Sequence, residues 1–70
     1  MKIADLLRHK RKQSGLLQLD LALRSGISQS MISRLESNSA ENVSIEVLRK
    51  LAHALNCALI DLLPDKDKQI

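Results

Sequence analysis

The absence of every aromatic residue is the feature that most constrains the fold of this chain. The 70 residues include 14 leucines but no Phe, Tyr or Trp, so the large contacts of a core must be aliphatic. Gly and Pro are scarce, which makes a helical pattern the first to test. The single cysteine, Cys57, cannot form an internal disulfide, so a chain this small depends on its core or on a partner subunit, and a reducing compartment suits it. We therefore expect one small all-α domain.

Apolar residues recur at helical spacing along most of the chain. This periodicity predicts four helices and a short fifth one: residues 2–13, 18–24, 28–36, 45–56 and 59–63. Residues 37–43 have the composition of a loop, and Pro64 stops the last helix. We therefore predict one domain over residues 1–63, followed by a polar C-terminal tail over residues 64–70.

Several residues carry the signals that begin and end helices. Gly15 ends the first helix, and Gly26 is placed as the left-handed residue that closes the second. Ser28 and Ser44 are the expected N-caps of the third and fourth helices, and Asn56 is expected to end the fourth. The second and third helices are thus joined by a turn of about three residues centred on Gly26.

Positive charge is concentrated in the first half of the chain. The net charge is +3, but residues 1–35 account for +5 and residues 36–70 for −2. This asymmetry suggests that one side of the domain meets a polyanion, while the lack of aromatic side chains excludes base stacking. No apolar run approaches the roughly 20 residues of a membrane span, and the N-terminus lacks the features of a signal peptide. We expect a cytoplasmic protein without membrane contact.

The third predicted helix carries a polar arc of hydrogen-bonding residues. At about 100° per residue, Met31, Ile32 and Leu35 gather on one side. The opposite arc holds Gln29, Ser30, Ser33 and Arg34. A Gln amide matches adenine N6 and N7, an Arg guanidinium matches guanine O6 and N7, and Ser can approach any base edge. After a glycine-containing turn, this arrangement is typical of a helix-turn-helix, although an ordinary solvent-exposed polar face accounts for the same residues about equally well.

The stretch KRKQSGLLQLDLALRSGISQSMISRLES resembles the lambdoid phage repressor and Cro family, also called the XRE family. The family's cap, turn and core residues occur at the same offsets without gaps: Gln18, Leu21, Ala22, Gly26, Ser28, Ile32, Leu35 and Glu36. The similarity continues through SIEVLRKLAHAL and LIDLL, so it covers roughly residues 3–63. It implies a compact five-helix, lambda-repressor-like domain with a helix-turn-helix formed by helices two and three. It also implies a transcriptional regulator, in most cases a repressor, that binds a palindromic operator as a homodimer.

The resemblance also assigns roles to individual residues. Base edges would be contacted by Gln29, Ser30, Ser33 and Arg34. Gln18 would contact a phosphate at the start of helix two. Further phosphate contacts are expected from Lys10, Lys12, Ser28 and Asn38. Arg11 and Glu36 would form a structural ion pair that orients the phosphate-contacting loop.

The chain departs from the family pattern where helix caps are usual. Leucine occupies position 17 and alanine occupies position 58, where the family has capping residues. Losing a capping side chain costs about 1 kcal/mol of helix stability. We therefore expect helix two and the short fifth helix to begin without a side-chain cap.

Leu19 and Leu23 stand at i and i+4 on helix two, at positions that the family normally gives to polar residues. Together with Leu17 they form a candidate partner surface, since exposed apolar clusters often mark interfaces. Ile60, on helix five, is a further candidate for a partner surface, because the family commonly dimerises through that helix. The register ENVSIEVLRKLA more closely resembles HipB-type antitoxins, which bind operator DNA and a toxin. The alternative is that these leucines lie on the surface only because the chain is rich in leucine, or that helix one tilts to cover their side chains.

Enzymatic chemistry has no support in the sequence. His9 and His53 belong to no cluster with metal-ligand spacing, and Cys57 suits buried packing. There is no phosphate-binding glycine loop and no pairing of a nucleophile with a base. We expect a protein that binds double-stranded DNA, requires no cofactor or metal, and is not an enzyme. The alternative is an interaction module that binds a partner protein, with DNA binding secondary.

Overall fold

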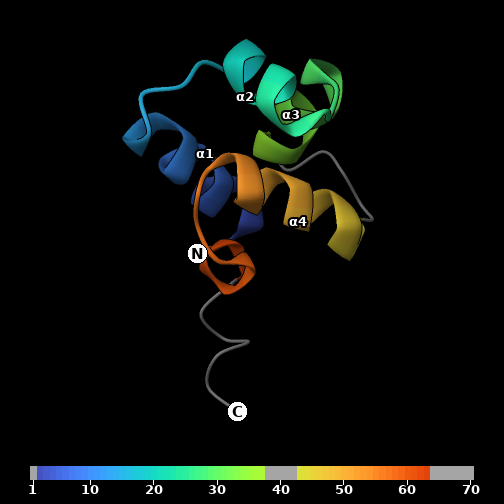
Figure 1. The fold of residues 1–70 in the computed structure, drawn as a ribbon. Coiled ribbons are helices and arrows are strands. Elements are labelled where there is room, and N and C mark those ends of the chain that lie inside the picture. Colours follow the sequence, from blue (N-terminus) through green and yellow to red (C-terminus); the bar gives the residue numbers. More distant parts are fainter. Residues whose placement is uncertain (1, 38–42, 64–70) are drawn as a thin grey trace.

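The computed structural model describes residues 2–37 and 43–63. Within these ranges the chain forms four α-helices and one 3-10 turn: α1 (Ile3–Gln13), α2 (Gln18–Ser25), α3 (Gln29–Glu36), α4 (Ile45–Ala54) and η1 (Leu59–Leu62). The four expected helices are confirmed, with boundaries that differ from the prediction by two residues at most. Figure 1 shows α2 and α3 together at one end of the domain and η1 at the other.

The expected fifth α-helix is wrong, because residues 59–62 form a single 3-10 turn. Its length is limited on both sides. Asn56 has a left-handed φ of 56°, which ends the preceding helix. Leu63 is extended, with ψ 144°, as expected for a residue that precedes a proline. Only six residues remain between these limits, and the turn takes the last four of them; such short segments commonly adopt 3-10 geometry.

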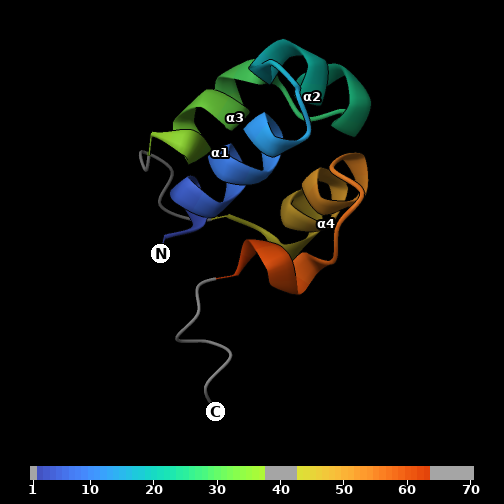
Figure 2. The ribbon, with the colours of Figure 1, turned by 90° about the vertical axis from the view of Figure 1, so that its left-hand side faces the viewer.

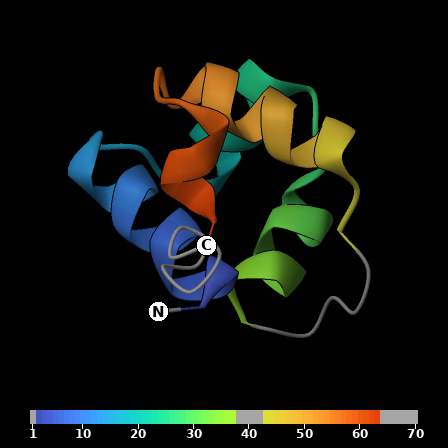
Figure 3. The ribbon, with the colours of Figure 1, turned by 90° about the horizontal axis from the view of Figure 1, so that it is seen from below.

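The five elements surround one core. Each packs closely against two others, in the order α1, α3, α2, α4, η1 and back to α1. In the turned view of Figure 2, α2 and α3 again lie side by side, above α1 and α4. Seen from below in Figure 3, η1 lies between α1 and α4. η1 therefore completes a ring of five elements around the core, because it packs against both α4 and α1.

The core is aliphatic, and every element contributes one fully buried side chain to it. These five residues are Leu7, Leu21, Ile32, Leu51 and Leu62. Burying a side chain of this size contributes about 1.5–3 kcal/mol to stability. Because each element supplies one of the five, none of them can shift without opening the core.

Side chains cap all four helical starts after α1, although in two different ways. The Ser28 and Ser44 hydroxyls each accept a hydrogen bond of 3.1 Å from the backbone N–H three residues later, which confirms both N-caps. Leu17 and Ala58 provide no cap, as expected. Instead, the Asp20 carboxylate accepts from the Leu17 N–H at 2.9 Å, and the Asp61 carboxylate accepts from the Ala58 N–H at 3.0 Å. Each of these bonds is the half of a capping box in which the side chain three residues later accepts from the N-cap N–H. A carboxylate there also interacts favourably with the positive end of the helix dipole, so the two bonds offset part of the stability lost with the capping side chains.

Gly26 adopts the left-handed conformation expected of it. Its φ is 76°, and its N–H donates to the carbonyl oxygen of Ala22 at 3.0 Å. An L-residue pays a steric cost in this region that glycine avoids. The turn between α2 and α3 therefore stays tight, and α3 begins three residues after Gly26.

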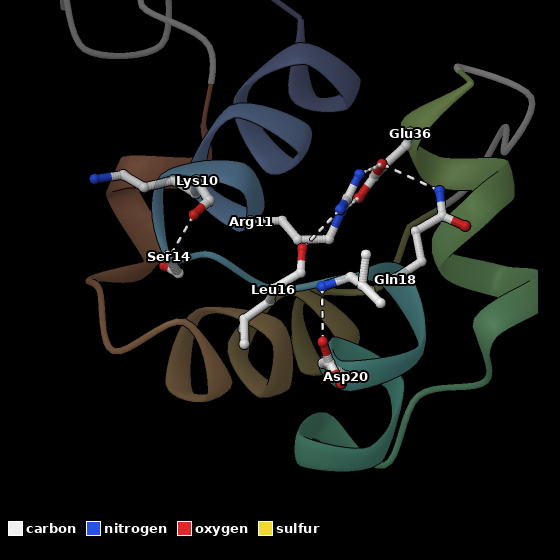
Figure 4. Close-up of polar contacts among 8 residues, drawn as sticks. Lys10, Arg11, Ser14, Leu16, Gln18, Asp20 and Glu36 are labelled. Atoms are coloured by element: carbon white, nitrogen blue, oxygen red, sulfur yellow. Dashed lines mark hydrogen bonds and ion pairs between the residues drawn. The ribbon is translucent and has the colours of Figure 1, made fainter.

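A buried ion pair joins α1 to the end of α3. The Arg11 Nε and Nη2 atoms donate to the two oxygens of Glu36 at 2.7 Å and 2.9 Å, and the Arg11 Nη1 atom donates to the Leu16 carbonyl at 2.8 Å (Figure 4). The two charged side chains are only 9% and 4% exposed. The hydrogen bonds that Arg11 donates to Glu36, and to a lesser extent the charge of Glu36, raise the pKa of Arg11 against the opposing effect of burial. The pair expected from the resemblance is thus present, and it fixes three segments relative to one another.

We predict that Glu36→Gln lowers the free energy of unfolding by about 3 kcal/mol, because it leaves the buried Arg11 guanidinium without a counter-charge. Glu46→Gln is the matched control, since it breaks an exposed pair with Lys50 at 3.6 Å and should change stability by less than about 0.5 kcal/mol. Urea denaturation followed by far-ultraviolet circular dichroism measures both. Equal losses in the two variants would show that the buried pair does not hold the fold.

Candidate nucleic-acid interface

Polar side chains from α2 and α3 line an open depression of about 490 Å³. The lining residues are Gln18, Gln29, Ser30, Ser33 and Arg34. All four residues predicted to contact base edges are therefore exposed and lie together, and the glutamine that begins α2 joins them. The lining contains hydrogen-bond donors and acceptors but no carboxylate, so nothing in it repels a polyanion.

The packing of α3 determines which of its residues face this depression. Ile32 and Leu35 are buried in the core cluster, and Met31 packs against it. Positions four residues apart lie on one face of a helix, so residues 29, 30, 33 and 34 must share the opposite side. The Ser28 cap fixes the first turn of this helix. The amphipathic pattern of α3 thus presents its polar arc to solvent.

Arg34 is the only charged residue that lines the depression. Within the described part of the chain, its guanidinium makes no hydrogen bond or ion pair with another residue, and the side chain is exposed. An unengaged guanidinium offers a planar set of donors that fits the two acceptors on the major-groove edge of guanine.

Gln18 connects the depression to the buried ion pair. Its Nε2 atom donates to Glu36 Oε1 at 3.2 Å, and the Arg11 Nη2 atom donates to the same oxygen at 2.9 Å. The contact between Gln18 and Glu36 was missed at the level of sequence, because it joins residues 18 positions apart. The sequence held no signal for it beyond the resemblance, which assigned each residue a separate role.

The residues expected to contact phosphate do not all lie together. Lys10 and Lys12 are separated by about 200° around α1, so they occupy opposite flanks of that helix. Lys10 is half-buried near η1, and Figure 4 shows its side chain pointing away from Gln18 and Glu36. Lys12 and Ser28 are exposed. Asn38 lies outside the described residues.

Lys10 instead contributes to the surroundings of Cys57. The Cys57 thiol is half-buried against the core, as expected. Burial and then the charge of Asp61 raise its pKa, while the charge of Lys10 lowers it in part. A raised pKa keeps a thiol protonated and unreactive at neutral pH.

The leucines on the outer face of α2 are exposed in the structure. Leu17, Leu19 and Leu23 are 69%, 51% and 77% exposed, so α1 does not tilt to cover them. Ile60 is 52% exposed on η1, the element that Figure 1 shows at the opposite end of the domain from α2. Ile45, the first residue of α4, is also 51% exposed.

Other kinds of site were sought over residues 2–37 and 43–63. In these ranges no group of three or more His, Cys, Asp or Glu side chains is arranged to hold a metal ion. The helices in the same ranges are too short or too polar to cross a membrane.

Residues 7–62 match the helix-turn-helix family HTH_3, and the 32% identity to a named regulator agrees with this match. That relative is the HTH-type transcriptional regulator SinR of Bacillus licheniformis, aligned over 66 residues. The alignment covers 94% of this chain and 60% of the relative, so the chain spans about three fifths of that protein's length. No solved structure matches the chain significantly. The chain belongs to the XRE-type helix-turn-helix family, whose members are DNA-binding regulators and not enzymes.

Proposed function

We propose that this protein binds specific double-stranded DNA sites as a homodimer and represses transcription, with α3 in the major groove. One observation carries the proposal: the polar arc of α3 and Gln18 of α2 line a single open depression. A helix-turn-helix places the same side of its second helix against base edges. The family membership supports DNA as the ligand rather than another polyanion.

The chemistry of the arc suggests how bases are selected. Arg34 would contact guanine O6 and N7 through two donors, and Gln29 would contact adenine N6 and N7. Ser30 and Ser33 are short, so they would bring the helix close to the bases while discriminating weakly between them. Specificity would then depend mainly on two long side chains at opposite ends of the arc.

Contacts to phosphate would hold the domain in position. Lys12 supplies an exposed charge at the end of α1, and Ser28 lies exposed at the start of α3. Positive potential at the start of a helix favours a phosphate there. Lys10 is not part of this proposed set, because it lies on the opposite flank of α1. A contact from Asn38 stays a prediction.

Two copies would occupy a two-fold symmetric operator. Dimeric helix-turn-helix proteins place their half-sites about one helical turn of DNA apart. Ile60 is our candidate for the surface between the two copies, because it is a large exposed apolar residue on η1. The named relative, a transcriptional regulator, supports a role in gene regulation.

We expect Arg34→Ala to weaken binding to the preferred operator by about 1–3 kcal/mol and to relax base preference at one position in each half-site. Arg49→Ala removes the same charge from the exposed surface of α4 and should leave base preference unchanged. Lys12→Ala should weaken binding to all sequences alike. Selection of duplexes from a random library, followed by titration at two salt concentrations, measures these effects. Unchanged base preference in Arg34→Ala would show that this face does not contact the bases.

A second candidate function is docking of a protein partner, such as a toxin, on the leucines of α2. The exposure of Leu17, Leu19 and Leu23 is the observation that favours it. Leu17, at the N-cap of α2, and Leu19 and Leu23, one turn apart on that helix, are therefore all open to solvent. In this case DNA binding would be secondary to holding the partner.

Leu23→Ser tests the second function, because Leu23 is 77% exposed and its replacement should change stability by no more than about 0.5 kcal/mol. If the leucines dock a partner, this variant loses the protein that co-purifies with the wild type and keeps the wild-type DNA selectivity. Ile45→Ser, at a residue that is 51% exposed at the start of α4, is the control for loss of an exposed apolar side chain elsewhere. Retention of the partner by Leu23→Ser would rule out this surface.

A further inference from the structure

The solvent side of α2 carries two pairs of side chains with the same spacing. Leu19 and Leu23 are four positions apart and exposed. Asp20 and Arg24 are also four positions apart. At about 100° per residue, the members of each pair lie about 40° apart, and the charged pair lies about 100° further around the helix than the leucines. Since Leu21 is fully buried, the opposite side of α2 has an apolar flank and a charged flank.

The charged flank is free to meet another molecule. Arg24 is exposed, and over residues 2–37 and 43–63 its side chain forms no ion pair. The Asp20 Oδ2 atom accepts from the Leu17 N–H at 2.9 Å, whereas the other oxygen of this carboxylate accepts no hydrogen bond in the same ranges. An acid and a base at this spacing can pair on one helix, but these two do not. Each can therefore pair with an opposite charge on a partner.

We propose that this face of α2 docks on the same face of a second copy of the chain, with the two helices antiparallel and related by a two-fold axis. Such a contact brings like flanks together, leucine against leucine, and reverses their order along the helix. Asp20 of one copy then lies beside Arg24 of the other, and this pair occurs twice. Parallel helices related by a two-fold axis would instead set each apolar flank against a charged one.

The charges favour a second copy over an unrelated protein, because the face is complementary to its own reverse. Its small area indicates where the contact forms. A stable interface buries about 800 Å² on each partner and uses about 20–30 residues a side. Two leucines and one acid–base pair supply only part of that, so this face alone does not hold free copies together. Copies tethered to one DNA molecule meet at an effective concentration on the order of millimolar, at which a weak contact suffices.

The position of α2 suits a contact between neighbouring dimers. Figure 1 shows α2 and η1 at opposite ends of the domain. If the operator-bound dimer forms at η1, as proposed for Ile60, its two α2 faces stay uncovered. Dimers on adjacent operators would then meet through α2 and bind cooperatively. This inference rests on the proposed function and adds a second contact between copies to it.

Arg24→Glu is the direct test, since it sets acid against acid in both halves of the contact. Duplexes carry two selected operators, over a series of spacings that covers one helical turn of DNA. Cooperativity is the ratio of affinities for one operator with the other occupied and empty, so a general loss of DNA affinity cancels. We expect a ratio of about 5- to 150-fold at the best spacing for the wild type and about one for the variant. Arg49→Glu, an exposed charge reversal on α4, is the matched control and should keep the wild-type ratio.

Asp20→Lys combined with Arg24→Glu exchanges the two charges and should return the ratio toward the wild-type value. Because this double variant loses the bond to the Leu17 N–H, it is compared at a temperature where circular dichroism shows it folded. Leu23→Ser should lower the ratio to about one. A wild-type ratio of about one at every spacing would overturn the proposal, and so would a ratio that both Arg24→Glu and Leu23→Ser leave unchanged. A folded double variant that recovers no cooperativity would overturn the antiparallel pairing.

A measurement without DNA separates this inference from the proposed function. In Ile60→Ser, which lacks the proposed contact at η1, the methyl signals of Leu19 and Leu23 should shift on dilution from millimolar concentration. Those of Ile45, exposed on α4, should stay constant. Constant signals at the two leucines would overturn the contact, and loss of a co-purified protein by Leu23→Ser would then assign the face to another kind of partner. If these signals shift but the wild type enriches no inverted repeat, the proposed function fails and the contact between copies stands.

Discussion

The bidentate pair between Arg11 and Glu36 is the interaction on which the other features of this domain depend. Removing two charges from water costs several kcal/mol for each, and the pair repays this only when the remaining donors and acceptors are also satisfied. Here they are, because the third Arg11 contact goes to the Leu16 carbonyl and Glu36 also accepts from Gln18. In the described residues no buried side-chain polar atom is left without a partner. The same atoms therefore anchor the loop before α2, the end of α3 and the first residue of the proposed DNA-binding surface.

The short elements make this dependence cooperative. Helices of eight to eleven residues are marginal in isolation, so each takes its stability from the shared core. Since every element buries one fully enclosed aliphatic side chain, the orientation of α3 is a property of the whole arrangement. An aliphatic core also explains how a chain without aromatic residues specifies one fold. Branched side chains of similar volume interlock at close packing without the polar atoms that Tyr and Trp would have to satisfy.

Local signals allowed the helices and their caps to be predicted, and failures arose where structure depends on distant residues. Ser28, Ser44 and Gly26 act within a few residues of their positions, so sequence sufficed for them. The carboxylates of Asp20 and Asp61 were overlooked although their spacing, three residues after each missing cap, is visible in the chain. The exposure of the α2 leucines depends on the tilt of α1, which no local pattern encodes. Helical spacing on α3 sufficed to place Gln29, Ser30, Ser33 and Arg34 on one face, and these are four of the five residues that line the depression. The hydrogen bond between Gln18 and Glu36 could not be predicted in this way, because it joins two helices that meet only in the folded domain.

The two faces of α2 show how one short helix can serve two kinds of contact. Gln18 turns inward, toward Glu36 and the depression. Leu23 lies five positions later, about 140° around the helix, and is open to solvent. A partner that covers the leucines would therefore approach from a different direction than DNA in the depression. Because Gln18 is held by a buried carboxylate and not by the outer surface, binding at the leucines would leave its amide in place. DNA recognition and partner binding would then be compatible on the same domain.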